Sequence, residues 1–202
     1  WLVDGLIGAG LTILGGKAKI GKSWLVQDLG CSVQNGIAFM SKETLKGNVM
    51  HYALEDNEYR LNKRLKVQGH HELKSLPTYQ TKGKKPLIPS LLEGLPEEID
   101  NWFGADPKNT LVIIDTYGRV KSLLGLHKAN AYEIDVMNLS PLQEVGMKYQ
   151  DKYIVMTHHL KKEEVGEDPY NLLSGSTGIQ STCDGMIVLK SDRRKGYGMS
   201  AH

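Results

Sequence analysis

One stretch near the start of this chain, residues 16–23, limits what the chain can fold into. It reads Gly-Lys-Ala-Lys-Ile-Gly-Lys-Ser and fits the pattern G-x-x-x-x-G-K-[ST] at every fixed position. Glycines let the backbone approach a bound anion and turn its N–H groups inward. A helix that begins at the end of the stretch adds the partial positive charge of its N-terminus. The stretch therefore predicts a phosphate-binding loop between a strand and a helix.

The fixed positions of this loop predict a nucleotide ligand. Lys22 is expected to reach the β and γ phosphates of ATP, and the Ser23 hydroxyl is expected to hold Mg²⁺. The residues expected to contact the nucleotide are Gly16, Lys17, Ala18, Lys19, Ile20, Gly21, Lys22, Ser23 and the adjacent Trp24.

The sequence on both sides of the loop agrees with this prediction. The apolar run 11–14 indicates a buried strand before the loop. After it, Leu25, Leu29 and Val33 recur at helical spacing, and Gly36 supplies a stop. Strand, glycine loop and helix are the arrangement that this chemistry needs.

Length and composition indicate one globular α/β domain. The 202 residues contain 40% hydrophobic and 24% charged residues, and the net charge of +2 is too small to indicate a dedicated nucleic-acid-binding domain. Cys31 and Cys183 form no disulfide framework or metal motif, and both are expected to stay reduced. No apolar run approaches the roughly 18 residues of a membrane span, and no secretory signal is visible. We expect a cytoplasmic domain, residues 1–202, that is a fragment of a longer chain.

The remaining chain alternates between strand and helix patterns. Buried strands are expected at 49–54, 110–115, 153–157 and 185–189, with a short one at 76–80. Helices are expected at 57–68, 89–103 and 132–150. In the last of these, residues 140–143 fit a capping box, which predicts a new helix or a sharp kink. The alternation predicts a mainly parallel sheet with helices on both faces.

Acidic residues follow two of these strands, where ligands bind in parallel sheets. Asp115 ends Val-Ile-Ile-Asp, the Walker B form, and is expected to hold Mg²⁺ together with Ser23. Thr116 stands where many P-loop ATPases have a catalytic glutamate. Glu55, with Asp56 as an alternative, is therefore expected to activate the attacking water. A helix-capping role for this pair remains open.

His158 and His159 follow the strand 153–157. Adjacent residues in an extended chain point to opposite sides, so the two are not expected to share a metal ion. One of them facing the γ-phosphate would sense its presence. A buried histidine that is hydrogen-bonded to the backbone is an equally good interpretation of either one alone.

Taken together, these motifs resemble those of the RecA-like AAA family ATPases of the RepA type, hexameric replicative helicases of plasmids with relatives in phages and mobile elements. The matching segments are Gly-Lys-Ala-Lys-Ile-Gly-Lys-Ser-Trp, Tyr-Ala-Leu-Glu-Asp-Asn with Arg60 and Arg64, Val-Ile-Ile-Asp-Thr, Thr-His-His-Leu-Lys-Lys, and Ser-Gly-Ser-Thr-Gly-Ile with Asp184. They span nearly the whole chain.

The resemblance implies a homo-oligomer, a hexameric ring that binds ATP between subunits and single-stranded DNA in its central channel, often beside a primase. It implies that Glu55 is the catalytic base, that Asp115 is the Mg²⁺ ligand, and that the phosphate sensor lies in the pair His158 and His159.

One position departs from the family pattern. The plasmid helicase has an arginine finger near the place where this chain has Asp184. An arginine supplied by a neighbouring subunit stabilises the transition state in such enzymes. Here Arg193, which together with Lys190 resembles the Lys-x-x-Arg neighbourhood of related motors, is the expected substitute.

The segment 116–131 is the best candidate for DNA contact. It follows the Walker B strand and contains Arg119, Lys121, His127 and Lys128 but no acidic residue. DNA phosphates would favour such a loop, and we expect Arg119, Lys121 and Lys128 to contact DNA. A solvated loop with incidental lysines is the alternative. The loop after His159 carries both signs of charge, and Tyr117 is the only aromatic residue close to the first loop.

The sequence thus predicts an ATP-hydrolysing motor domain that acts on DNA, a ring-forming replicative helicase. A RecA-like switch that uses ATP to control assembly or recombination without unwinding is the alternative. A small-molecule kinase shares the loop, but the chain shows no arginine-rich lid.

Overall fold

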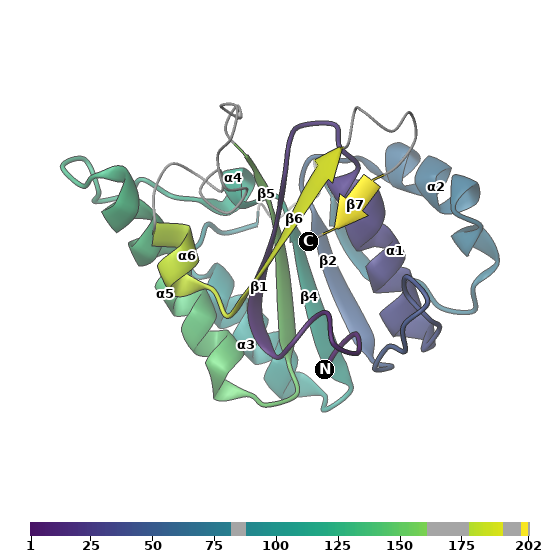
Figure 1. Cartoon of the computed structure of the whole chain (residues 1–202). Helices are drawn as coiled ribbons and strands as arrows, with labels where there is room; N and C mark the ends of the chain where they lie inside the picture. The colour runs from purple at the N-terminus through teal and green to yellow at the C-terminus, as the bar shows by residue number, and fades with distance from the viewer. Residues whose placement is uncertain (82–87, 161–177, 192–198, 202) are drawn as a thin grey trace.

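The computed structural model describes residues 1–81, 88–160, 178–191 and 199–201. Its centre is a seven-stranded sheet in the order β3-β2-β4-β5-β1-β6-β7 (Figure 1). The strands are β1 Gly10–Gly16, β2 Asn48–Ala53, β3 Thr78–Thr81, β4 Asn109–Asp115, β5 Tyr153–His159, β6 Gly185–Ser191 and β7 Met199–Ala201. The pairings among β1 to β6 are all parallel, and β7 pairs antiparallel with β6.

Helices cover both faces of the sheet. They are α1 Lys22–Asn35, α2 Glu58–Val67, α3 Leu95–Ala105, α4 Tyr117–Val120, α5 Ala131–Lys148 and α6 Gly178–Thr182, with a short 3-10 turn at His70–Glu72. Helices α1 and α2 lie on one side of the sheet, and α3, α5 and α6 lie on the other (Figure 1). The predicted α/β class with helices on both faces is confirmed.

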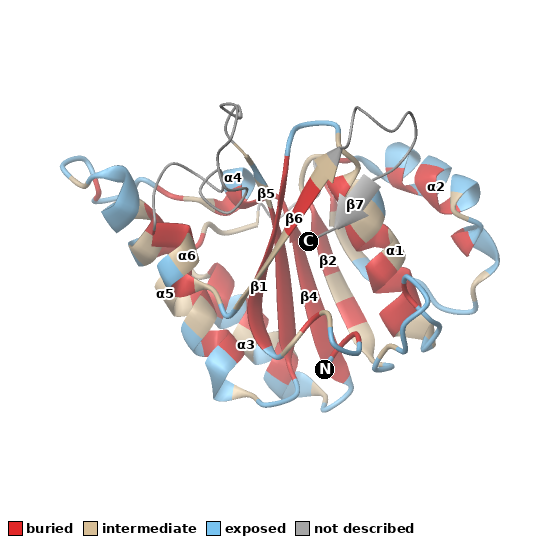
Figure 2. Ribbon diagram, in the orientation of Figure 1, coloured by how far each residue is buried: buried red, intermediate tan, exposed pale blue. Residues whose placement is uncertain are grey.

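The central strands are buried on both sides, as their unbroken apolar runs predict. Every residue of β1 and β4 is buried (Figure 2). Alternate side chains of β4 enter two separate apolar clusters. Val112 and Ile114 pack with residues of α3 and α5, whereas Leu111 and Ile113 pack with residues of α1. This double burial fixes the register of the strands, and with it the position of each strand end.

The ends of α1 lie where the sequence predicts them. The helix begins after Gly21, which has φ 109°, and ends at Gly36, which has φ 67°. Both are left-handed conformations that glycine adopts without strain from a Cβ. The predicted helix 57–68 also forms, and the Asn57 side chain caps it by accepting a hydrogen bond from the Arg60 N–H.

The predicted start of the third helix was wrong. Helix α3 begins at Leu95, not at residue 89, because residues 91–94 form a turn that ends in Gly94 at φ 110°. Pro96 then lies in the first turn of the helix, where its missing N–H costs no hydrogen bond.

The predicted new helix at residues 140–143 was also wrong. Helix α5 runs continuously through Pro141, and the capping box is formed by Asn130 and Glu133 at its start. A proline inside a helix costs about 3 kcal/mol. Leu139 and Leu142 on either side are fully buried, and each contributes about 1.5–3 kcal/mol. Packing against the sheet therefore offsets the cost of the proline.

Because β1, β2, β4 and β5 are parallel, their carboxyl ends meet at one edge of the sheet. The loop after β1, the acidic residues after β2 and at the end of β4, and the histidines of β5 all lie there. Among the described residues, no helix is both long enough and apolar enough to cross a membrane.

Candidate nucleotide-binding site

A cleft of about 370 Å³ lies at this edge of the sheet. It collects side chains from the loop after β1, from α1 and α2, and from the ends of three other strands. The lining residues are Lys19, Ile20, Gly21, Lys22, Ser23, Trp24, Glu55, Arg60, Arg64, Asp115 and His159. The fold therefore brings the predicted phosphate loop, metal ligands, base and sensor to one place.

The amino end of α1 opens into this cleft. Within the part of the chain that the structure describes, no side chain caps it, and its first turn contains no acidic residue. The first N–H groups of a helix have no partner within the helix, so they and the helix dipole favour an anion at this position. The loop before the helix is closed by a hydrogen bond from the Ile20 N–H to the Lys17 carbonyl (3.3 Å). This geometry fits a phosphate group.

Lys22 is held at the base of the cleft, with only 5% of its surface exposed. Its Nζ donates to the carbonyl oxygens of Gly16 (2.6 Å) and Lys17 (3.0 Å) and lies 3.1 Å from Nδ1 of His159. Burial lowers the pKa of Lys22 to about 8, while the carboxylates of Asp115 and Glu55 oppose this shift. Since an ammonium has three N–H donors, a phosphate must replace one of these partners.

Asp115 and Ser23 supply the oxygen atoms that a magnesium ion would need. Asp115 is 3% exposed, and its Oδ1 accepts a hydrogen bond from the Thr157 hydroxyl (2.5 Å). Among the described residues there is no cluster of three or more His, Cys, Asp or Glu side chains that could hold a metal ion. Magnesium commonly takes one or two protein ligands and completes its shell with phosphates and water. The two residues therefore fit Mg²⁺ bound together with a nucleotide.

The structure separates the two carboxylates that the sequence left open. Glu55 lines the cleft, with Oε1 3.5 Å from Nε of Arg119 and Oε2 3.8 Å from Nε2 of His159. Asp56 is 2% exposed and is ion-paired with Arg64 (2.7 Å) and Arg60 (3.3 Å). Glu55 can therefore meet a water molecule in the cleft, whereas Asp56 anchors two arginines.

Arg60 and Arg64 are site residues that the sequence reasoning did not assign. Both line the cleft from α2, and the guanidinium of Arg64 lies 5.5 Å from the centre of the Trp24 ring. Their spacing of four residues placed them on one face of the helix. The additional signal was Asp56, because a carboxylate buried at a strand end needs a cationic partner.

The two histidines point to opposite sides of β5, as expected. His159 lies in the cleft between Lys22 and Glu55. The ring of His158 instead packs edge-on against that of Tyr117, at 5.3 Å between centroids. Burial lowers the pKa of His158 to about 4. Of the predicted sensor pair, only His159 is placed to meet a phosphate.

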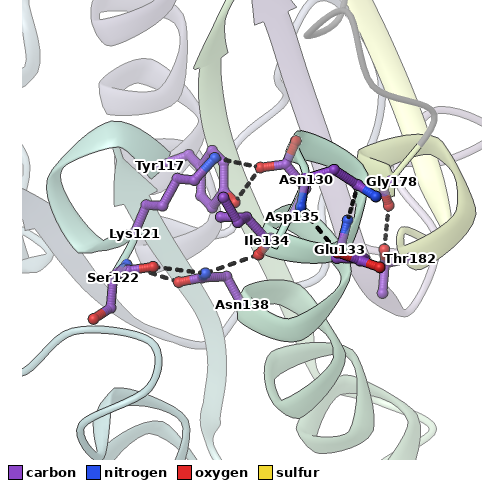
Figure 3. Close-up of polar contacts among 10 residues, drawn as sticks. All are labelled: Tyr117, Lys121, Ser122, Asn130, Glu133, Ile134, Asp135, Asn138, Gly178 and Thr182. Carbon is purple, nitrogen blue, oxygen red and sulfur yellow. Dashed lines mark hydrogen bonds and ion pairs between the residues drawn. The ribbon is translucent and has the colours of Figure 1, made fainter. Parts of the chain in front are cut away.

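The predicted DNA-binding segment is fixed by contacts with α5 (Figure 3). Nζ of Lys121 lies 2.6 Å from Oδ1 of Asp135, which argues against Lys121 as a free DNA contact. Tyr117 is 2% exposed and donates to the same carboxylate (2.7 Å), so its ring is not available for stacking on a base. Arg119 and Lys128 are exposed.

Asp184 lies at the opposite edge of the sheet from the cleft. Its Oδ2 accepts a hydrogen bond from the Leu11 N–H (2.8 Å), and Gln143 donates to its Oδ1 (3.3 Å). Asp184 therefore fixes the start of β1. Arg193, the predicted arginine finger, and the loop 161–177 lie outside the described residues, whereas Lys190 lies on β6.

Comparisons with known proteins agree with this geometry. A family model described as an AAA domain (AAA_25) matches residues 1–165. No curated protein sequence matches. Among solved structures, the ATPase domain of another protein is similar with a TM-score of 0.66 at 12% sequence identity, over 93% of this chain and 72% of that chain. At this identity the likeness shows a shared fold.

Proposed function

Because the chain belongs to the AAA domain family and has the α/β fold of RecA-like ATPase domains, we propose that it binds and hydrolyses ATP with Mg²⁺ in the cleft. The observation that carries this proposal is the convergence of Lys22, Glu55 and Asp115 on one cleft. These residues lie on three separate segments of the chain.

Phosphate binding rests on Lys22 and the amino end of α1. The Lys22 ammonium exchanges one of its loop carbonyls for a phosphate oxygen, while the uncapped N–H groups of α1 receive the other oxygens. Trp24, Arg60 and Arg64 form the part of the wall where an apolar ring meets positive charge. Such a wall suits the rest of a nucleotide.

Ser23 and Asp115 would hold the magnesium ion. When bound, Mg²⁺ neutralises charge on the β and γ phosphate oxygens. The Thr157 hydroxyl fixes the Asp115 carboxylate from behind, because hydrogen bonds to a ligand orient it toward the metal.

Glu55 orients the attacking water and accepts its proton. His159 lies between this carboxylate and the Lys22 ammonium, so it is placed to sense whether the γ-phosphate is present. Transition-state charge also requires an arginine from a neighbouring subunit, and Arg193 is the proposed residue.

We further propose that the domain is a motor on DNA, a hexameric ring helicase of a plasmid, phage or mobile element that acts beside a primase. The exposed Arg119 and Lys128, in the segment that follows Asp115, support contact with single-stranded DNA. The motif resemblance supports the ring. This second proposal requires oligomerisation, which would place ATP between subunits.

An ATPase assay with and without single-stranded DNA tests both proposals. Glu55→Gln is expected to keep nucleotide binding and to abolish turnover, while Glu144→Gln, an exposed carboxylate on α5, should behave like wild type. Normal turnover by Glu55→Gln would show that the base is assigned wrongly. ATP hydrolysis without DNA stimulation or strand separation would favour the nucleotide-dependent assembly switch.

A further inference from the structure

We propose that Arg119 restrains the catalytic carboxylate of Glu55 in the absence of DNA, and that a nucleic-acid phosphate releases it by competing for the guanidinium. This inference rests on the proposed function, because it assigns Glu55 as the base. It adds a connection between the DNA segment and the ATP cleft within one subunit.

The contact that carries the inference joins two segments with different predicted roles. Nε of Arg119 lies 3.5 Å from Oε1 of Glu55, and Oε2 of the same carboxylate lies 3.8 Å from Nε2 of His159. Both oxygens of the carboxylate are therefore directed at nitrogen atoms of the protein. A general base needs one of its oxygens directed at the attacking water.

The backbone around Arg119 is anchored, so this contact is part of the fold. Arg119 lies in α4 between Tyr117 and Val120, which are 2% and 1% exposed. Tyr117 and Lys121 both bind the Asp135 carboxylate of α5 (Figure 3).

The anchoring continues into the next residue. Ser122 exchanges two backbone hydrogen bonds with the buried Asn138 side chain, at 2.8 and 2.9 Å (Figure 3). The neighbours of Arg119 are thus fixed, whereas its own side chain is 51% exposed. The guanidinium is accessible to a ligand from solvent while its Cα stays in place.

The strength of the pair suits a contact that a ligand displaces. Glu55 is 35% exposed and Arg119 is 51% exposed, so water and salt weaken their attraction. Pairs of this kind shift an equilibrium by about 1.5- to 5-fold. A DNA strand presents a dense row of phosphates with which arginine forms favourable contacts. The phosphates therefore compete successfully for Arg119.

Release of Glu55 would reach the phosphate site directly. The carboxylate contacts His159, and His159 contacts the Lys22 ammonium. Moving Glu55 away from Arg119 leaves one carboxylate oxygen free for water and leaves Lys22 unchanged. DNA is therefore expected to raise kcat with little effect on the KM for ATP.

The test is the ATPase rate of the whole protein with and without a single-stranded oligothymidylate. Arg119→Gln is expected to raise the DNA-free rate by about 1.5- to 5-fold and to reduce DNA stimulation by the same factor. Arg119→Lys keeps the charge and is expected to give intermediate values. Lys63→Gln, an exposed lysine on α2, removes equal charge and should leave both rates unchanged.

Three results would overturn the inference. A lower DNA-free rate in Arg119→Gln would make Arg119 an aid to catalysis. An unchanged DNA-free rate with weaker oligonucleotide binding would make it a DNA contact alone. A raised DNA-free rate with undiminished DNA stimulation would remove nucleic acid as the trigger. Failure of the proposed function is distinguishable, because there Glu55→Gln itself would retain turnover.

Discussion

Nδ1 of His159 lies 3.1 Å from Nζ of Lys22. The other ring nitrogen of His159 faces Glu55 at 3.8 Å. One imidazole thus connects the residue that meets the phosphates with the residue that activates water. This connection decides what a substitution at His159 should do.

We expect His159→Asn to lower kcat for ATP hydrolysis by about tenfold to a hundredfold, with a small change in KM. A hydrogen bond to a charged group contributes about 1.5–3 kcal/mol, and this one acts on the catalytic geometry. Steady-state ATPase kinetics measure the effect.

His158→Asn is the matched control for that experiment. His158 packs against Tyr117 outside the cleft, so its substitution should lower the melting temperature and leave the kcat of the folded protein nearly unchanged. A larger loss of kcat in His158→Asn than in His159→Asn would contradict the assignment of His159.

Thr157→Val should weaken the response to magnesium. The hydroxyl donates to Asp115 at 2.5 Å, and valine removes it with little change in shape. Loss of a hydrogen bond behind a metal ligand costs about 10- to 100-fold in metal affinity or activity. We expect the Mg²⁺ concentration for half-maximal turnover to rise about tenfold in a magnesium titration. An unchanged midpoint would mean that the hydroxyl does not orient Asp115.

Asp56→Asn should destabilise the fold strongly. It breaks the buried pair with Arg64 at 2.7 Å, and loss of one partner of a buried pair costs about 3–5 kcal/mol. Urea unfolding measures the loss. Asp100→Asn provides the comparison, because its pair with Lys148 lies at the surface and should matter far less. Equal effects of the two substitutions would show that Asp56 is not the anchor of α2.

Stability should fall as the pH decreases from about 6.5 to about 4. Burial lowers the pKa of both His51 and His158 to about 4, and among the described residues neither ring nitrogen of His51 has a hydrogen-bond partner. Between these pH values the unfolded chain binds more protons than the folded one, so acid favours unfolding. The free energy of unfolding should change by about 1.4 kcal/mol per pH unit for each histidine.

Urea unfolding at several pH values checks this dependence. His158→Gln should reduce the slope between pH 6.5 and 4 and leave the His51 contribution in place. A wild-type free energy of unfolding that stays constant across this range would rule out buried neutral histidines as its cause.

Much of the fold followed from local patterns. The strand before the loop, both ends of α1 and the buried run of β4 depend on residues close together in the chain, so the sequence predicts them well. The prediction failed at Pro141 and at residues 89–94, where it depended on a single local signal. Burial of Leu139 and Leu142 against the sheet outweighed the helix-breaking proline, and no local pattern contains that packing.

The site divides in the same way. The sequence by itself determined the phosphate loop, the Walker B aspartate and the opposite orientation of the two histidines, because these depend on adjacent residues and on the two-residue period of a strand. Only the tertiary structure decided that Glu55 faces the cleft while Asp56 pairs with Arg64, and that Arg119 reaches Glu55 from a distant part of the chain. Those pairings depend on which strand ends lie next to each other, and long-range packing of the sheet sets that order.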